Sequence, residues 1–208
     1  MARVSYANAV GSLMYGIMCT RPDICYAVGF LNRFQSNSGL APWKAVKRIL
    51  RYLKGTTDYV LCYQGSNLRK IGYSDADWGS DLDDCKFTSR YAFLLNKGTV
   101  TWSSKKQSFI ALSTVEAKYV TCLAVVQEAV WNHEVVEDAL NLVTVHCDSM
   151  SALAYANDSK YHGKTKHIDI RYHYIREIVA HSEVVLKHIS SRHMIVDPQI
   201  KPIGRDAF

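Results

Sequence analysis

The chain has 208 residues, of which 48% are apolar and 21% charged, a composition typical of a globular protein rather than of a disordered tail. No stretch approaches the roughly 20 apolar residues of a membrane span, and the start lacks the layout of a secretory signal peptide. The six cysteines are scattered without a C-x-x-C pair, which argues against a disulfide framework or a zinc site. We therefore expect an intracellular, cytoplasmic protein that makes no membrane contact.

The net charge of +6 arises entirely in the first third of the chain. Residues 1–66 contain eight Lys or Arg and two Asp or Glu, whereas residues 67–208 contain seventeen of each sign. A local excess of positive charge suggests a polyanionic partner. On charge alone, a solvated helix face explains the same excess equally well.

Residues 1–66 are predicted to form a helical, basic segment. Helices are expected at Ala7 to Met18, at Asp23 to Phe34 after Pro22, and from Pro42 to Gly55. The apolar face of the third helix comprises Trp43, Val46, Ile49, Leu50 and Leu53. Its basic face comprises Lys44, Lys47, Arg48, Arg51 and Lys54, and we predict that this face contacts a phosphate backbone.

Residues 67–208 are predicted to form one α/β domain. Strands are expected at Ile71 to Trp78, Tyr91 to Leu95, Thr99 to Trp102, Leu142 to Cys147 and Glu183 to Ile189, with a further strand at Tyr59 to Tyr63 and a continuation at Phe109 to Leu112. Helices are expected at Thr114 to Leu140, Ser149 to Ala156 and Lys166 to His181, and after Pro198. Three leading strands joined antiparallel, followed by helix-linked parallel strands, predict a mixed five-stranded sheet.

Four carboxylates fall where such a sheet would gather them, although each also has a local explanation. Asp75 lies in the first strand, with Asp77 on the same side of the pleat, and an edge strand turning into solvent would explain both. Glu116 completes a capping box with Ser113 at the start of the long helix. Asp148 and Asp197 suit helix N-caps, the latter before Pro198.

Taken together, these positions predict a metal site. Clustered carboxylates repel one another unless cations neutralise them. A few hard oxygen ligands favour magnesium, with manganese as a substitute, and two ions about 4 Å apart would activate a water and stabilise a leaving oxygen. Lys105 and Lys106 are candidates for phosphate contact, although two exposed lysines in a loop are usually only solubilising.

Several long motifs, spread over nearly the whole chain, resemble one known family. They are Ala9-Val10-Gly11-Ser12-Leu13-Met14-Tyr15, Cys19-Thr20-Arg21-Pro22-Asp23-Ile24, Ile49-Leu50-Arg51-Tyr52-Leu53-Lys54-Gly55-Thr56, Tyr73-Ser74-Asp75-Ala76-Asp77-Trp78, Trp102-Ser103-Ser104-Lys105-Lys106-Gln107, Ala111-Leu112-Ser113-Thr114, Cys147-Asp148-Ser149 and Thr165-Lys166-His167-Ile168-Asp169-Ile170-Arg171-Tyr172-His173. In this order they resemble the C-terminal end of a copia-type LTR retrotransposon polyprotein.

The resemblance implies a reverse transcriptase connection segment at residues 1–66 and a ribonuclease H-like domain at residues 67–208. It implies catalytic and metal-binding roles for Asp75 (with Asp77 as the alternative), Glu116, Asp148 and Asp197. His188 and His193 are candidates for the mobile histidine that many ribonucleases H place before the last aspartate.

The chain also departs from the family pattern. Arg90 stands where the family usually has glycine, and Lys118 where it usually has glutamate. The segment around Asp197 is looser than the family's.

Two hypotheses follow for the function. The first is a nuclease that hydrolyses the RNA strand of an RNA–DNA hybrid with two magnesium ions, working with the reverse transcriptase portion of the parent polyprotein. The second is a catalytically inactive relic or a nucleic-acid-binding module. Cutting of a labelled hybrid by the wild-type chain and by an Asp148→Asn variant separates the two.

Overall fold

The computed structural model describes residues 5–36, 38–65, 69–77, 86–135, 142–157, 175, 177–179, 181 and 184–194. They divide into two compact units, one containing the described residues up to Cys62 and the other those from Tyr63 onward. Within these ranges no helix is both long and apolar enough to cross a membrane. Most of the helix predicted from Lys166, and all of the helix predicted after Pro198, lie outside the described residues.

The first unit is helical, as predicted. Its elements are α1 (Tyr6–Cys19), the 3₁₀ turn η1 (Pro22–Ile24), α2 (Cys25–Leu31), the 3₁₀ turn η2 (Asn32–Phe34) and α3 (Leu40–Gly55). The predicted middle helix is therefore a short α-helix between two 3₁₀ turns. Val46 and Ile49 of α3 are buried, but Leu50 is 47% exposed, so the apolar face is narrower than predicted.

A polar network joins η1 to α3 inside this unit. Arg21 Nη2 lies 2.6 Å from Asp23 Oδ2, and the Tyr52 hydroxyl donates to the same oxygen at 2.8 Å. Arg21 also donates to Thr56 Oγ1 at 2.7 Å. Burial alone would raise the pKa of Asp23, but the hydrogen bonds from Arg21 and Tyr52 outweigh it and lower this pKa below its usual value.

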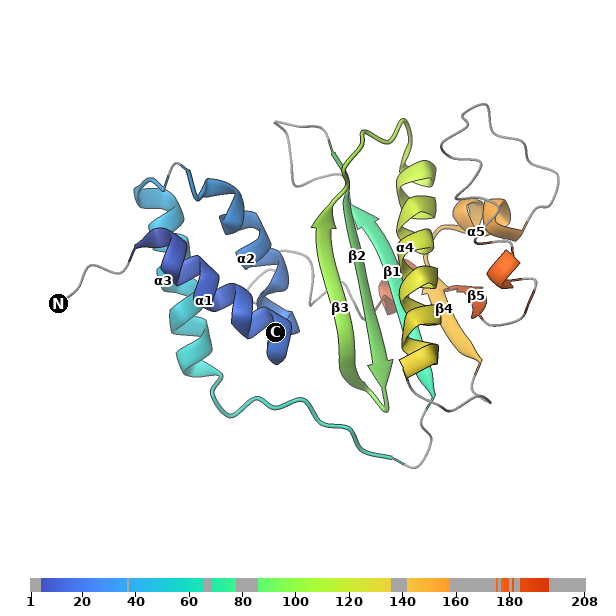
Figure 1. Ribbon diagram of the computed structural model, residues 1–208, viewed down its shortest axis with the longest axis horizontal. Coiled ribbons are helices and arrows are strands. Elements are labelled where there is room, and N and C mark those ends of the chain that lie inside the picture. Colours follow the sequence, from blue (N-terminus) through green and yellow to red (C-terminus); the bar gives the residue numbers. More distant parts are fainter. Residues whose placement is uncertain are drawn as a thin grey trace. The chain divides into compact units, whose positions relative to one another are not determined.

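The second unit contains a five-stranded sheet in the order β3-β2-β1-β4-β5 (Figure 1). The strands are β1 (Lys70–Asp77), β2 (Thr88–Leu95), β3 (Gly98–Lys106), β4 (Val143–Cys147) and β5 (Val184–His188). β1, β2 and β3 pair antiparallel, whereas β4 and β5 add in parallel. The predicted ribonuclease H-like arrangement, preceded by a helical segment, is confirmed.

Two smaller strand predictions are wrong. Tyr59 to Tyr63 forms no strand, and the side chains of Tyr59 and Val60 are 70% and 75% exposed. Phe109 to Leu112 does not continue β3, because that strand ends at Lys106. Both segments are continuous apolar runs, and such a run forms a strand only where a neighbouring strand is present to pair with it.

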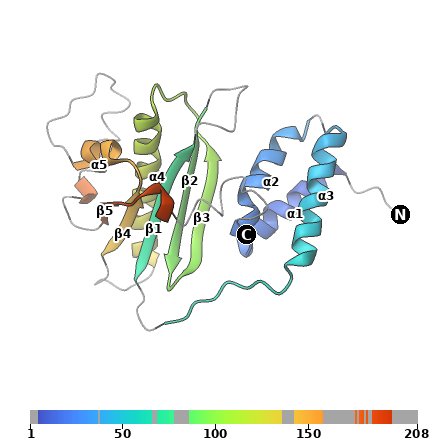
Figure 2. The ribbon, with the colours of Figure 1, turned by 180° about the vertical axis from the view of Figure 1, so that it is seen from behind.

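Helices α4 (Thr114–Val135) and α5 (Met150–Asn157) complete the described part of this unit. In one buried cluster, Val125, Val126 and Ala129 of α4 pack with Phe93 of β2 and with residues of β4 and β5. Figure 2 shows the same sheet from behind, with α4 beyond the strands. Nearer the start of α4, Ala117 shares a buried cluster with Ala76 of β1, and Tyr119 shares another with Cys147 of β4, which places this part of the helix beside the candidate site.

Candidate functional site

Asp75 and Asp148 are brought side by side by the pairing of two parallel strands. Ser74 of β1 lies opposite Cys147 of β4; Asp75 is the next residue of β1, and Asp148 is the first residue after β4. Asp75 is buried, with 5% of its surface exposed, and the side chain of Asp148 is 11% exposed. The pair therefore lies at the carboxyl ends of adjacent strands, where ligand sites form in α/β sheets.

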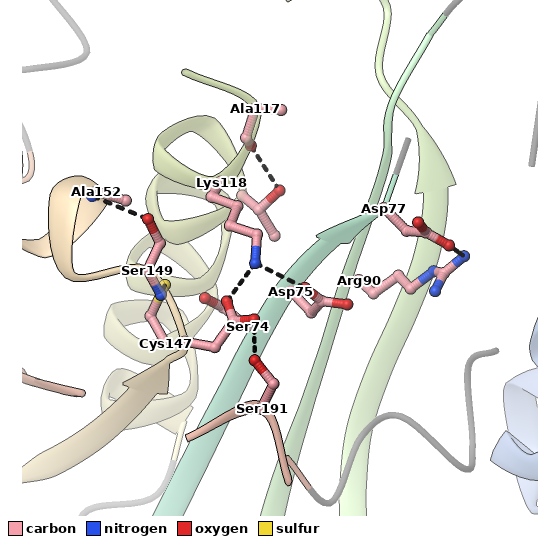
Figure 3. A network of polar contacts seen from close by, with 12 residues as sticks. Ser74, Asp75, Asp77, Arg90, Ala117, Lys118, Cys147, Ser149, Ala152 and Ser191 are labelled. Atoms are coloured by element: carbon pink, nitrogen blue, oxygen red, sulfur yellow. Dashed lines mark hydrogen bonds and ion pairs between the residues drawn. The ribbon is translucent and has the colours of Figure 1, made fainter. Parts of the chain in front are cut away.

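The ammonium group of Lys118 bridges this pair of aspartates (Figure 3). Lys118 lies in the second turn of α4, and its Nζ is 2.5 Å from Asp148 Oδ1 and 3.5 Å from Asp75 Oδ1. The other oxygen of Asp148 accepts a hydrogen bond from Ser191 Oγ at 3.0 Å. Ser191 belongs to η3 (Ser191–His193), which follows β5.

The surroundings of Lys118 favour its charged form. Burial by itself would lower its pKa, but the hydrogen bond and charge of Asp148, together with the charge of Asp75, raise this pKa above its usual value. The side chain is therefore a cation at neutral pH, held between two acidic groups.

Glu116 is engaged as a helix cap. Its Oε2 accepts the backbone N–H of Leu112 at 2.7 Å, and its own N–H donates to Ser113 Oγ at 3.1 Å. Two residues along an α-helix turn by about 200°, so Glu116 and Lys118 project from different sides of α4. The structure thus brings Lys118, rather than Glu116, to the aspartate pair, and a metal-binding role for Glu116 stays a prediction.

A second cation lies beside the pair. Arg90 of β2 is fully buried and lies directly opposite Asp75 in the antiparallel register. Its Nη2 is 3.1 Å from Asp77 Oδ2. The carboxylates of Asp75, Asp77 and Asp148 are therefore accompanied by two side-chain cations, Arg90 and Lys118 (Figure 3). Buried charges are tolerated when paired in this way.

Three other predicted residues lie apart from this network or outside the structure. Asp197 lies outside the described residues. His188 ends β5 with its side chain exposed, and His193 is exposed in η3, two residues after Ser191. Their catalytic roles stay predictions.

The residues that the structure describes do not fit a two-metal centre. In the described part of the chain, no group of three or more His, Cys, Asp or Glu side chains is placed to hold a metal ion. The stronger observation is that both aspartates that approach one another contact an ammonium, which would repel a divalent cation. From the sequence, Lys118 stood out only as a departure from the family's glutamate, and nothing marked Ser191.

Positive side chains line two further surfaces. The five predicted basic residues of α3 are all exposed, and none forms an ion pair with a described residue; they are Lys44, Lys47, Arg48, Arg51 and Lys54. In the second unit, Lys105 is exposed and Lys106 half-buried at the end of β3, beside a cavity of about 430 Å³. Both sets remain predicted nucleic-acid contacts.

Known proteins resemble the chain over most of its length. It is 44% identical to the retrovirus-related Pol polyprotein from transposon TNT 1-94 of Nicotiana tabacum, over all of this chain and 16% of that protein. Secreted RxLR effector protein 161 of Plasmopara viticola is 46% identical over 63% of this chain and 93% of its own length. The foamy viral protease-reverse transcriptase dRH in complex with double-stranded DNA matches 89% of this chain and 32% of its own, with a TM-score of 0.60 and 12% identity. No protein-family model matches.

The mixed five-stranded sheet, with three antiparallel strands joined by two parallel ones and preceded by a helical segment, has a ribonuclease H-like fold. The chain belongs to the family of retrovirus-related Pol polyproteins from plant transposons. It spans only 16% of the tobacco polyprotein's length.

Proposed function

We propose that this chain is the connection segment and ribonuclease H-like domain of a copia-type LTR retrotransposon polyprotein, and that it binds an RNA–DNA hybrid without cutting it. Family membership and the sheet support the first part. One observation carries the second part, namely the contact of Lys118 Nζ with both Asp75 and Asp148.

This contact matters because of the chemistry that the site would need. Magnesium binds through carboxylate oxygens and retained waters, and it needs near-ideal octahedral geometry. In this chain one oxygen of each aspartate faces an ammonium, and the second oxygen of Asp148 accepts a hydrogen bond from Ser191. Three of the four carboxylate oxygens of the pair are therefore engaged by the protein itself, namely Asp75 Oδ1 and both oxygens of Asp148.

Binding of nucleic acid does not need a metal. The exposed basic face of α3 suits contacts with a phosphate backbone, and such contacts depend strongly on salt. Lys105 and Lys106 would add phosphate contacts in the second unit. Selectivity for RNA would come from its 2′-hydroxyl groups in the minor groove. The reverse transcriptase portion of the parent polyprotein is the expected protein partner, within the cell.

A second candidate function is metal-dependent hydrolysis of the RNA strand of the hybrid. The observation that favours it is the convergence of Asp75 and Asp148 at the carboxyl ends of adjacent strands. It would need two magnesium ions, or manganese in their place, and a displaced Lys118.

One experiment decides between the two candidates. The purified chain and an Asp148→Asn variant are incubated with a labelled RNA–DNA hybrid in magnesium or manganese, and both binding and cutting are followed. We expect salt-dependent binding by both proteins and cutting by neither. Cutting by the wild-type chain that is lost in Asp148→Asn would establish the second candidate instead.

A further inference from the structure

Lys118 supplies the positive charge that allows the carboxylates of Asp75 and Asp148 to lie close together. The two carboxylates belong to neighbouring strands and are largely buried, so their repulsion is only weakly screened by solvent. The ammonium contacts one oxygen of each. In this arrangement the protein supplies from its own chain the positive charge that a metal ion would otherwise supply.

We infer that Lys118 is an internal cation that excludes divalent metal from the Asp75–Asp148 pair, and that the identity of residue 118 alone decides whether the pair binds metal. This inference rests on the proposed function, because it concerns the same site of the ribonuclease H-like domain.

The position of Lys118 in the fold explains why its ammonium competes well. The residues on either side of it, Ala117 and Tyr119, are 0% and 1% exposed, so the backbone of α4 is fixed by the core at this point. The ammonium is tethered next to the carboxylates and is present at every metal concentration. Magnesium, by contrast, must give up tightly held water to bind.

The inference also predicts what another side chain would do at this position. Glutamine would remove the charge and leave two facing carboxylates that need a cation. Glutamate would add a third oxygen ligand from α4, completing a set of three acidic side chains from β1, the end of β4 and α4. Arg90 stays in place in both variants, because it contacts Asp77.

Manganese binding, measured from the electron paramagnetic resonance signal of free Mn²⁺, tests this inference without nucleic acid. The proteins are the wild type, Lys118→Gln, Lys118→Glu and the control Lys97→Gln, which removes the same charge from an exposed residue of the β2–β3 turn. We expect no binding by the wild type or Lys97→Gln, weak binding by Lys118→Gln, and binding by Lys118→Glu at least about tenfold tighter than by Lys118→Gln. Circular dichroism melting checks that each protein is folded.

Two results would overturn the inference. One is manganese binding by the wild type as tight as by Lys118→Glu, with loss of that binding in Asp75→Asn. The other is a folded Lys118→Gln protein that binds no more manganese than Lys97→Gln. This second result would overturn the inference even if Lys118→Glu does not fold. Failure of the chain to bind a hybrid would overturn the proposed function alone, because no hybrid is present in this experiment.

Discussion

Lys118 Nζ lies 2.5 Å from Asp148 Oδ1 and so joins the second turn of α4 to the end of β4. The same nitrogen is 3.5 Å from Oδ1 of Asp75, which lies two residues before the end of β1. Three elements of the fold are therefore connected through one ammonium. We expect this contact to stabilise the fold, because it balances charge in a largely buried part of the domain.

Replacing Lys118 by methionine is expected to destabilise the second unit. The change leaves Asp75 and Asp148 facing each other without their shared cation, and Asp75 is buried. We expect a loss of about 1–3 kcal/mol in the free energy of unfolding, below the full cost for a deeply buried pair because the Lys118 side chain is 20% exposed.

Urea unfolding at neutral pH measures this loss, with Lys97→Met as the control for a surface lysine. The double variant Lys118→Met/Asp148→Asn should recover part of the stability, because it removes one of the two facing charges. A Lys118→Met protein as stable as the control would show that the bridge contributes nothing.

The Arg21–Asp23–Tyr52 network predicts an acid-sensitive contribution to the first unit. The folded pKa of Asp23 lies below its ordinary value of 3.8, so the carboxylate stabilises the fold fully above that value. This contribution is lost as the pH falls through the lowered folded pKa. Asp23→Asn should therefore cost about 1–2 kcal/mol at pH 7 and almost nothing in strong acid.

Unfolding of wild type and Asp23→Asn across this pH range, followed by near-ultraviolet circular dichroism, checks the prediction. Tyr52→Phe serves as a milder variant, since it removes one of the hydrogen bonds to Asp23. A difference between wild type and Asp23→Asn that persists unchanged into strong acid would contradict the assignment.

Gly72 in β1 lets side chains from the two flanking strands, β2 and β4, pack closely against its backbone. A Cβ at this position would lie 2.7 Å from Phe93 Cε1 and 3.1 Å from Val145 Cγ2. Phe93 and Val145 are fully buried, so neither side chain moves aside freely. Gly72→Ala should cost about 1–3 kcal/mol, and Gly72→Ala/Phe93→Leu should cost less than the two single changes together. Thermal unfolding of the three variants tests this coupling.

The basic face of α3 predicts how hybrid binding responds to salt. If its side chains contact phosphates, then Lys47→Gln/Arg51→Gln should weaken binding and reduce the slope of log affinity against log salt by about 0.7–0.9 for each contact removed. Lys97→Gln, outside the basic face, should leave the slope unchanged. Fluorescence anisotropy of a labelled hybrid at several salt concentrations gives the slope for each protein. Equal slopes for the wild type and both variants would show that α3 does not contact the hybrid.

The sheet was predictable because its apolar strands are separated by clear turns. Asn96 and Lys97 form the turn between β2 and β3, both with positive φ (48° and 70°), which suits a two-residue hairpin. The convergence of Asp75 and Asp148 was also predictable, since Asp75 lies in the last part of the first strand and Asp148 directly follows a later strand expected to pair beside it. The absence of a strand at Tyr59 to Tyr63 was not predictable, because a pattern of apolar residues does not reveal whether a pairing strand lies beside it.

The composition of the site was harder to predict than its place. Glu116 matched both a capping box and the family motif, and only the structure shows its carboxylate bonded to Leu112 N–H. Lys118 lies two residues further on, on the side of α4 that faces the aspartates. Which of the two reaches the strand ends depends on the rotation of α4 against the sheet, a tertiary property that local sequence does not contain.

Diffraction from manganese-soaked crystals tests the exclusion of metal by Lys118 most directly. Wild-type and Lys118→Glu crystals would be soaked alike and compared in anomalous difference maps. We predict a manganese peak between Asp75 and Asp148 in Lys118→Glu and none there in the wild type, where Lys118 stays in contact with Asp148. A peak between the two aspartates of the wild type, with Lys118 turned away, would contradict this account.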